Sequence, residues 1–360
     1  MNIGMRVALV LAGCLGIIIY FRSIIRMVLL NRRERDVLGR AAGRFAVTLV
    51  QGLSRDKRSY EDVQRLQAWV MPLFIFTIVS IWFLLVQLSF SFILWGVSAE
   101  PDWLRAFLSS GSALSTLGYL TPKTSLGEAL ATFEAAIGLG IVMLLFTFVP
   151  GYQAAIVVRE RKVGWLDSRA GGRNTACVSL LESLHRAGRT YDANIWEEWE
   201  AWFRGLLETH SISPVLAYVP SVYRGGSWLA TSAAVLDAAS LLLVSAEPKD
   251  AEAARICRET GVTALRTIAA ELVGARSSDV RAEEHRAPAA SAALVELHGK
   301  LPGLGLPVAE EKDRWAQSFM TLRADYASHL RRISAATLMP FHEPWERPRS
   351  DESLQARRQN

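Results

Sequence analysis

The residues with the clearest chemical use in this chain form one short run, Thr116-Leu117-Gly118-Tyr119. An ion that enters a bilayer must exchange its hydration shell for protein oxygens, which rings of backbone carbonyls can supply. Gly118 suits an extended turn that requires positive φ or crowded geometry, and the hydroxyl of Thr116 can form the innermost ring. The run is therefore a candidate ion-binding turn, in which Thr116 and Gly118 would be the metal positions at which carbonyls hold a monovalent cation.

No other pattern in the sequence predicts chemistry. The six histidines show no His-x-x-x-His or Glu-x-x-His spacing, no serine or cysteine lies in a nucleophile motif, and no Gly-x-Gly-x-x-Gly follows a strand pattern. The cysteines Cys14, Cys177 and Cys257 are far apart, so structural disulfides are not expected. We expect neither an enzyme nor a cofactor, apart from the permeant ion.

Three long apolar runs predict the elements that must hold this segment in a membrane. At about 1.5 Å per residue, a helix of about 20 apolar residues crosses a hydrocarbon core of about 30 Å. The runs are Val7 to Tyr20 (extendable to Leu30), Trp69 to Trp95 with Pro72 and Gln87 as its interruptions, and Ala129 to Val149. A cleaved signal peptide is the alternative for the first run, but its heavy basic charge follows the run instead of preceding it.

The basic residues indicate how the spans are oriented. Arginines from Arg32 onward follow the first span, and basic residues from Arg159 onward follow the third, which is the positive-inside pattern. We therefore expect a multi-pass protein of the plasma (inner) membrane with its N-terminus outside and its C-terminal domain in the cytosol. The net charge of +5 fits this topology, so nucleic acid is not an expected partner.

Between the second and third spans, the chain from Pro101 to Leu126 is expected to dip back into the membrane. Pro101 in the first turn and Asp102 beside it favour the start of a short helix. The C-terminal end of that helix, near Ser115, directs the negative end of its dipole toward a cation held at the following turn.

This stretch, Pro101 to Val149, resembles the pore of bacterial tetrameric potassium channels, whose filter usually reads Thr-Val-Gly-Tyr-Gly-Asp. The matching residues are Thr116-Leu117-Gly118-Tyr119, then Leu126-Gly127-Glu128 and Ile137-Gly138-Leu139-Gly140-Ile141 at the start and hinge of the inner helix. The resemblance implies that Thr116-Leu117-Gly118-Tyr119 is the selectivity filter. It also implies passive potassium conduction by a homotetramer in a lipid bilayer, because one loop per chain cannot close a ring. It also implies that Tyr119 points backward and braces the loop.

Two positions depart from that family pattern. Leu120 stands where the second glycine usually lies, and Thr121 stands where the aspartate usually lies. Leucine does not easily adopt the left-handed geometry that glycine permits. We expect the outer ion sites to be reshaped, which weakens the preference for potassium and admits sodium.

Four residues are expected to support the filter, namely Ser112, Ser115, Leu120 and Glu134. Glu134 lies about two turns into the third span, and ionisable residues inside membranes are functional candidates. Either it forms a hydrogen bond behind the filter, with Ser112 as the partner, or it lines the pore.

Four further residues are candidates for a gating hinge, namely Gly138, Gly140, Pro150 and Gly151. Glycine and proline weaken a helix, and Pro150-Gly151 is expected to interrupt the hydrogen-bond ladder near the cytosolic mouth. The alternative is that these small residues only let helices pack closely.

The chain after Arg169 is soluble and helical in composition. Apolar residues recur at spacings of three and four, which is typical of amphipathic helices. The expected helices are Thr175 to Ala187, Tyr191 to Thr209, Ser227 to Val244, Asp250 to Val273, Pro288 to Lys300 and Val308 to Ala336. The aromatic stripe Trp196, Trp199, Trp202 and Phe203 is interpreted as core or interface, and Asp237 as a buried, hydrogen-bonded carboxylate.

The predicted fold is an all-α membrane protein. It has three transmembrane helices, a re-entrant pore helix and filter loop between the second and third, and an all-α cytosolic C-terminal domain. The domains are residues 1–66 (first span and basic linker), 67–158 (pore), 159–338 (cytosolic) and 339–360 (disordered tail). Helical spacing from Arg32 to Arg65 predicts an amphipathic helix, either on the inner leaflet or packed on the cytosolic domain.

The leading hypothesis is a homotetrameric potassium channel that also passes some sodium. A non-conducting membrane-anchored sensor or scaffold with a degenerate pore fold is the alternative from another class. A potassium transporter subunit ranks last, because such chains usually carry four pore repeats and this one has a single repeat. The sequence names neither the gating stimulus nor a ligand or protein partner of the cytosolic domain.

Overall fold

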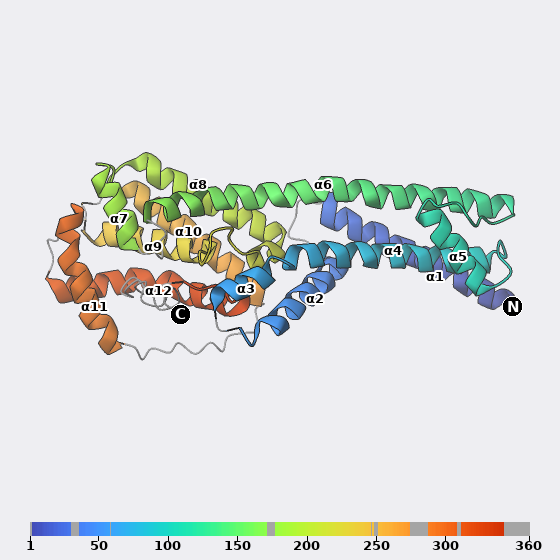
Figure 1. The fold of residues 1–360 in the computed structure, drawn as a ribbon, viewed down its shortest axis with the longest axis horizontal. Helices are drawn as coiled ribbons and strands as arrows, with labels where there is room; N and C mark the ends of the chain where they lie inside the picture. Colours follow the sequence, from blue (N-terminus) through green and yellow to red (C-terminus); the bar gives the residue numbers. More distant parts are fainter. Residues whose placement is uncertain are drawn as a thin grey trace, which may run out of the picture. The chain divides into compact units, whose positions relative to one another are not determined.

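The structure is a computed structural model that describes residues 2–29, 36–57, 59–170, 177–245, 247, 251–273, 287–307 and 311–341. These residues form helices and connecting turns, and no strand occurs among them (Figure 1). The all-α prediction is therefore confirmed for the described part of the chain. The predicted tail, residues 339–360, lies almost wholly outside it.

The chain divides into two compact units. Unit 1 comprises Met1–Leu53 and Trp69–Ala154, and unit 2 comprises Ser54–Ala68 and Ala155–Asn360. Unit 1 contains α1 (Ile3–Ile24), the π-helix η1 (Ile25–Leu29), α2 (Val37–Ser54), α4 (Val70–Gly96), α5 (Trp103–Leu114) and the first part of α6 (Ser125–Ala170). The predicted amphipathic helix of the basic segment is α2, which belongs to unit 1.

Small residues let α1 and α4 approach closely. A Cβ atom added at Gly16 would lie 2.1 Å from Ser89 Oγ, and one added at Gly13 would lie 2.5 Å from the Ser89 carbonyl oxygen. Helices in membranes associate through such small-residue contacts, because lipid provides no hydrophobic drive between them. The two helices therefore pack closely against each other at Gly13 and Gly16.

A short hydrogen-bond chain joins α1, α2 and α4. The Trp82 indole Nε1 donates to Ser23 Oγ at 3.1 Å, and Ser23 Oγ donates to Asp36 Oδ2 at 2.9 Å. The same carboxylate oxygen accepts from the backbone N–H of Gly39 at 2.6 Å, which satisfies a free donor at the start of α2. The polar groups of this buried junction are thus paired with one another.

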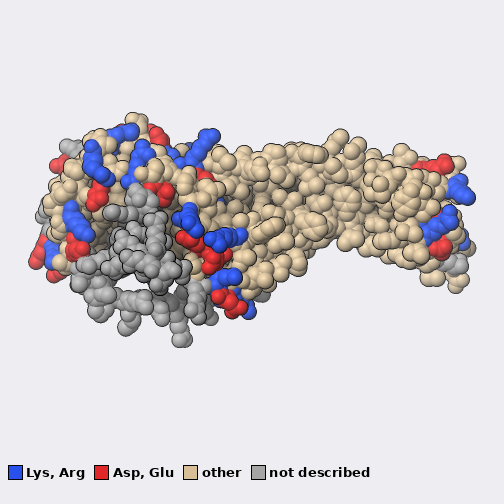
Figure 2. Space-filling view, viewed as in Figure 1, with Lys and Arg blue, Asp and Glu red and all other residues tan. Residues whose placement is uncertain are grey.

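In the described part of the chain, four helices are long and apolar enough to cross a membrane, which indicates a membrane-embedded, multi-pass protein. They are Ile3–Met27, Tyr60–Gly96, Ser125–Arg169 and Trp228–Ser245. The first three contain the three predicted spans and bury only 22%, 33% and 28% of their most apolar window. On the face drawn in Figure 2, charged side chains crowd over unit 2, whereas the middle of unit 1 is free of them.

The fourth candidate, Trp228–Ser245, was expected as a helix of the cytosolic domain. It meets the length and composition of a span, but 89% of its apolar window is buried inside the protein. A helix that is apolar on every side occurs in membranes and also at the centre of a large core. Its neighbours in unit 2, described below, account for its burial.

Helix α6 runs without a break for 46 residues, with Pro150 in its interior. The helix therefore does not end at Pro150-Gly151, and the predicted interruption is limited to the one ladder bond that Pro150 cannot donate. A proline removes one backbone donor and crowds one carbonyl, but this loss does not end a helix whose ladder continues on both sides. Membrane helices tolerate proline when the surroundings satisfy the freed carbonyl.

Unit 2 contains α3 (Tyr60–Gln67), the end of α6, and the helices after it. These are α7 (Cys177–Arg186), α8 (Ala193–Ile212), the 3-10 helix η2 (Pro214–Tyr218), α9 (Trp228–Ser245), α10 (Glu252–Val273), α11 (Ala287–Lys300), the 3-10 helix η3 (Leu301–Leu304) and α12 (Lys312–Thr337). Each of the six helices predicted after Arg169 is present, with ends that differ by up to four residues. The amphipathic periodicity was thus sufficient to locate them.

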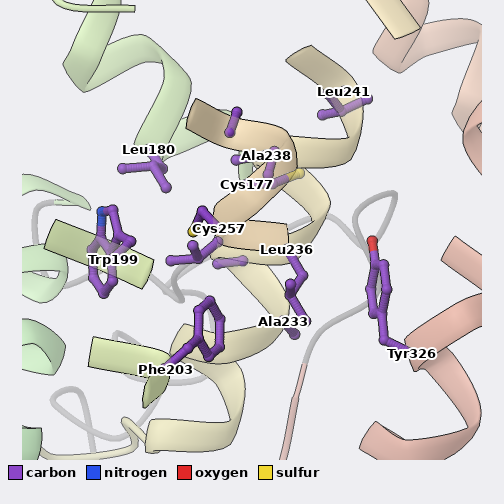
Figure 3. Close-up of a cluster of buried hydrophobic side chains, with 14 of the residues drawn as sticks. Cys177, Leu180, Trp199, Phe203, Ala233, Leu236, Ala238, Leu241, Cys257 and Tyr326 are labelled. Carbon is purple, nitrogen blue, oxygen red and sulfur yellow. The ribbon is translucent and has the colours of Figure 1, made fainter. Parts of the chain in front are cut away.

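The core of unit 2 surrounds α9, as Figure 3 shows for residues from α7, α8, α10 and α12. The aromatic stripe of α8 lies in this core, as expected, and Trp199 and Phe203 are almost fully buried. Cys177 and Cys257 are free thiols in the same core, where burial raises the pKa of both. The core is therefore made of packed apolar side chains, with no disulfide among its described residues.

Asp237 on α9 is a buried, hydrogen-bonded carboxylate, as predicted. Its Oδ1 accepts from Arg323 Nε at 3.0 Å and from the Tyr326 hydroxyl at 2.7 Å, both on α12. Burial, followed by the charge of Asp237, raises the pKa of Tyr326. A buried charge of this kind requires a paired, hydrogen-bonded partner, so the cluster fixes α12 against α9.

Candidate functional site

Helix α5 begins at Trp103 with Asp102 as its N-cap, so Pro101 lies before the helix and not in its first turn, where it was predicted. The Asp102 side chain accepts a hydrogen bond from the Arg105 backbone N–H at 2.8 Å and so caps the first turn. Arg105 also forms an ion pair with Glu100 at 3.2 Å. The start of the helix is therefore held by local polar contacts.

At the other end of α5, the chain turns sharply through the predicted filter residues. Gly118 has φ +67° and Thr116 has φ +59°. The expectation of positive φ at Gly118 is confirmed, while the left-handed conformation of Thr116 was not anticipated. A Cβ atom added at Gly118 would meet nothing within 4 Å, so the backbone conformation, and not lack of space, favours glycine there.

Ser112 on α5 anchors the whole turn. Its carbonyl oxygen accepts from the backbone N–H groups of Leu117 at 3.0 Å and Gly118 at 3.2 Å. Its side-chain Oγ accepts from the N–H of Leu120 at 3.0 Å. Three peptide groups of the loop are thus tied to one residue of the preceding helix.

These three bonds determine where the loop carbonyls point. A trans peptide is planar, so its C=O lies opposite its N–H. The N–H groups of Leu117, Gly118 and Leu120 face Ser112, and the carbonyls of Thr116, Leu117 and Tyr119, which share their peptide planes, therefore point away from it. The oxygens of the loop are directed toward its exposed side.

The side chains of the loop are exposed in the single chain. Leu117 is 71% exposed and Tyr119 is 65% exposed. The expectation that Tyr119 points backward to brace the loop is therefore wrong within its own chain. The peptide hydrogen bonds to Ser112 brace it instead.

Glu134 on α6 is completely buried, so it does not line an open surface of the chain. Its Oε1 lies 2.5 Å from Ser110 Oγ on α5, and not next to Ser112, which was the expected partner. Residues two positions apart in a helix differ by about 200° around its axis, so Ser110 and Ser112 face nearly opposite directions. Ser110 faces α6, and Ser112 faces the loop.

The four hinge candidates differ in their surroundings. A Cβ atom at Gly138 would lie 1.9 Å from the carbonyl oxygen of Leu114, the last residue of α5. The geometry at Gly138 therefore supports the alternative of close helix packing. Atoms added at Gly140 or Gly151 would meet nothing within 4 Å, and hinge motion at these two residues stays a prediction.

Among the described residues, positive φ at non-glycine positions occurs at Ser98, Thr116 and Leu338, and thus not at Leu120. The backbone of Leu120 is therefore not left-handed. This agrees with the expectation that leucine does not easily adopt that conformation. The other support candidate, Ser115, uses its hydroxyl to donate to the Gly111 carbonyl at 2.5 Å within α5. It therefore caps its own helix and makes no contact of this kind with the loop.

Gln87 on α4 is a site residue that the sequence did not identify. Its Nε2 donates to the Phe107 carbonyl at 3.3 Å, and a Cβ atom at Gly111 would lie 2.6 Å from the same nitrogen. The available signal was its position as the one amide side chain of an apolar span, where such residues pair with neighbouring helices.

In the part of the chain that the structure describes, no group of three histidine, cysteine, aspartate or glutamate side chains is placed to hold a metal ion. Comparison with known proteins found no matching family model, no matching curated protein and no matching solved structure. The proposal for function therefore depends on the geometry of the loop and the helices around it.

Proposed function

We propose that this protein is the subunit of a homotetrameric channel that conducts potassium passively, with some sodium permeation. The observation that carries the proposal is the attachment of three loop N–H groups to Ser112. It leaves the carbonyls of Thr116, Leu117 and Tyr119 on the exposed side of the loop. A row of backbone carbonyls is what replaces the hydration shell of a potassium ion in a filter.

One chain supplies one side of such a filter, so symmetry must supply the others. The side chains of Leu117 and Tyr119 are exposed in the single chain and are therefore available for contact with neighbouring chains in such an assembly. In a tetramer the neighbouring chains would cover them, and Tyr119 would brace the loop of a neighbour instead of its own.

The charge around the loop fits a monovalent cation. From Ser115 to Pro122 the chain carries no aspartate, glutamate, lysine or arginine, so the loop offers neutral dipoles. The C-terminal end of α5, which precedes the loop, contributes the partial negative charge of a helix end. A site with this weak negative field binds a cation loosely enough to let it pass.

The alternative function is a non-conducting membrane-anchored sensor or scaffold. Leu120 favours it, because a leucine stands at this position and its backbone is not left-handed. The outermost carbonyls would then lack the inward turn that a second glycine gives. This alternative and the channel predict different behaviour of the purified protein.

The decisive experiment measures subunit stoichiometry and potassium flux on the same preparation in liposomes. A tetramer that carries potassium flux supports the channel, and a stable oligomer without flux supports the scaffold. Replacing Gly118 by valine should abolish flux and leave the oligomer intact, since β-branched residues are strained at positive φ.

Gly52→Val is the matched control, because a Cβ atom at Gly52 meets nothing within 4 Å and no positive φ is required there. It should conduct as the wild type does. Unchanged flux in a Gly118→Val tetramer would refute the assignment of this loop as the ion path.

A further inference from the structure

A single hydroxyl joins three helices behind the loop. Ser110 Oγ on α5 lies 2.5 Å from Glu134 Oε1 on α6 and 2.9 Å from the backbone carbonyl oxygen of Gln87 on α4. The Ser91 hydroxyl donates to the same carbonyl at 2.6 Å. Ser110 thus has two close oxygen neighbours on two different helices.

The hydrogens of this cluster can be counted. A serine hydroxyl has one hydrogen to donate and can accept in addition. The Gln87 carbonyl can only accept, so the 2.9 Å contact requires that Ser110 donates to it. The hydrogen between Ser110 and Glu134 must then come from the carboxyl group.

The opposite arrangement leaves one contact repulsive. If Glu134 were a carboxylate, Ser110 would have to donate to it, and a lone pair of the serine oxygen would face the Gln87 carbonyl oxygen at 2.9 Å. A neutral carboxylic acid satisfies both contacts, because each neighbouring pair of oxygens then shares one hydrogen.

The charges near Glu134 also favour the neutral acid. α4 has no aspartate, glutamate, lysine, arginine or histidine, and the only charged residue of α5 is Arg105, which forms an ion pair with Glu100. On α6 the nearest charged residues are Glu128 and Arg159. Among described residues, Glu134 Oε2 has no hydrogen-bond partner. A carboxylate buried in this way, without a cation and with one oxygen unsatisfied, is unfavourable.

We propose that Glu134 carries a proton on Oε1 and donates it to Ser110, which in turn donates to the Gln87 carbonyl. This relay makes Glu134 a positioning residue that holds α5 between α4 and α6. Ser110 lies two residues before Ser112, whose three hydrogen bonds hold the loop. The relay therefore positions the loop from the opposite side of α5.

The proposal assigns a proton to Glu134 whether or not the protein conducts ions, and only the effect on the loop depends on the proposed function. A neutral acid adds no negative charge behind the loop, so the loop carbonyls alone face the cation. Loss of the proton would turn the Ser110 hydroxyl from the Gln87 carbonyl to the Glu134 carboxylate, so the contact with α4 would be lost and a buried negative charge would lie next to α5.

The test compares the full-length wild type with Glu134→Gln, Glu134→Leu and Ser110→Ala in the same lipid. The glutamine amide can donate to Ser110 as the acid does, whereas leucine fills space without donating. Infrared difference spectra between wild type and Glu134→Gln report the state of the carboxyl group. Thermal unfolding is measured from neutral to alkaline pH, and liposome flux is measured in parallel.

We expect the difference spectrum to show the carbonyl stretch of a protonated acid. Near neutral pH, Glu134→Gln should unfold at or above the wild-type temperature, because the unfolded wild type releases a proton there and the glutamine variant does not. Glu134→Leu and Ser110→Ala should unfold below Glu134→Gln. As pH rises from neutral, the wild type should lose stability, because the unfolded chain releases a proton that the folded chain keeps, and Glu134→Gln should lose less. Where wild type conducts, Glu134→Gln should keep its flux and Glu134→Leu should lose it.

Carboxylate bands at neutral pH, or a Glu134→Gln protein as unstable as Glu134→Leu, would overturn the proposal. The infrared and unfolding results do not require conduction. If no variant and no wild-type protein carries potassium, the proposed function fails, and the proton on Glu134 is still tested.

Discussion

The contact between Gly138 and the end of α5 provides the sharpest test of how the loop is positioned. A Cβ atom at Gly138 would lie 1.9 Å from the carbonyl oxygen of Leu114 and 3.0 Å from its carbonyl carbon. The obstacle is backbone, so no side chain can rotate away to make room. Gly138→Ala should therefore push the end of α5 away from α6.

The size of the effect follows from this geometry. The oxygen must move by about 1.5 Å to reach the 3.4 Å of an ordinary contact. Overpacking of this kind costs about 1–3 kcal/mol. Alanine also gains about 1 kcal/mol over glycine in a helix interior, which offsets part of that cost.

Gly140→Ala is the matched control on the same helix. A Cβ atom at Gly140 would meet nothing within 4 Å, so this variant gains the helix propensity without the collision. Gly138→Ala should thus be less stable than Gly140→Ala by about 1–3 kcal/mol. Because Leu114 precedes Thr116 by two residues, Gly138→Ala should also change the ratio of potassium to sodium flux.

The assay is thermal unfolding of both full-length variants in one detergent, followed by flux of each ion in liposomes. Equal unfolding temperatures for the two variants would refute the close contact between Gly138 and Leu114. A destabilised Gly138→Ala protein with an unchanged ion ratio would refute the link from this contact to the loop.

Two further predictions concern the core of unit 2 and the outer end of the loop. Burial, with the charge of Arg159 as the second cause, lowers the pKa of His210 from 6.5 to about 3, so the folded state keeps a neutral imidazole that the unfolded chain protonates. The free energy of unfolding should fall by about 1.4 kcal/mol per pH unit as pH decreases from 6.5 toward 3. It should fall less steeply in His210→Phe, which retains a ring against Trp228. Equal slopes for the two proteins in urea titrations would contradict this. Leu120→Gly should raise the preference for potassium over sodium, measured as reversal potentials under bi-ionic conditions, because glycine frees the outer carbonyl to turn inward. A wild-type protein that already excludes sodium as strictly as the variant would show that Leu120 does not limit selectivity.

The positions of the helices followed from the sequence because helix formation is largely a local property. The run Trp69 to Trp95 is too long and apolar for anything but a buried or membrane helix, and α4 covers Val70–Gly96. The cap at Asp102 and the positive φ of Gly118 were likewise readable, since each depends on a residue and its immediate neighbours. Asp237 was recognised as buried because a lone carboxylate in an apolar helix needs a partner.

The partners of those residues were decided by the tertiary structure. Glu134 lies next to Ser110 and not Ser112, because the rotation of α5 about its axis turns one serine toward α6 and the other toward the loop. Gly138 is a packing contact because the backbone carbonyl of Leu114, at the end of α5, lies directly against it. Gln87 joins the site because α4 passes α5 at the level of Phe107 and Gly111.

The sequence by itself determined which segments are helices, which of them are apolar enough to cross a membrane, and where the turn with Gly118 lies. Apolar run length, periodicity and the φ preference of glycine act within a few residues, so they can be read along the chain. The anchoring of three N–H groups by Ser112, and the position of Ser110 between Gln87 and Glu134, required the folded chain. Those contacts depend on the axial rotation and relative height of packed helices, which shift with small changes in side-chain packing and leave no local signature in the sequence.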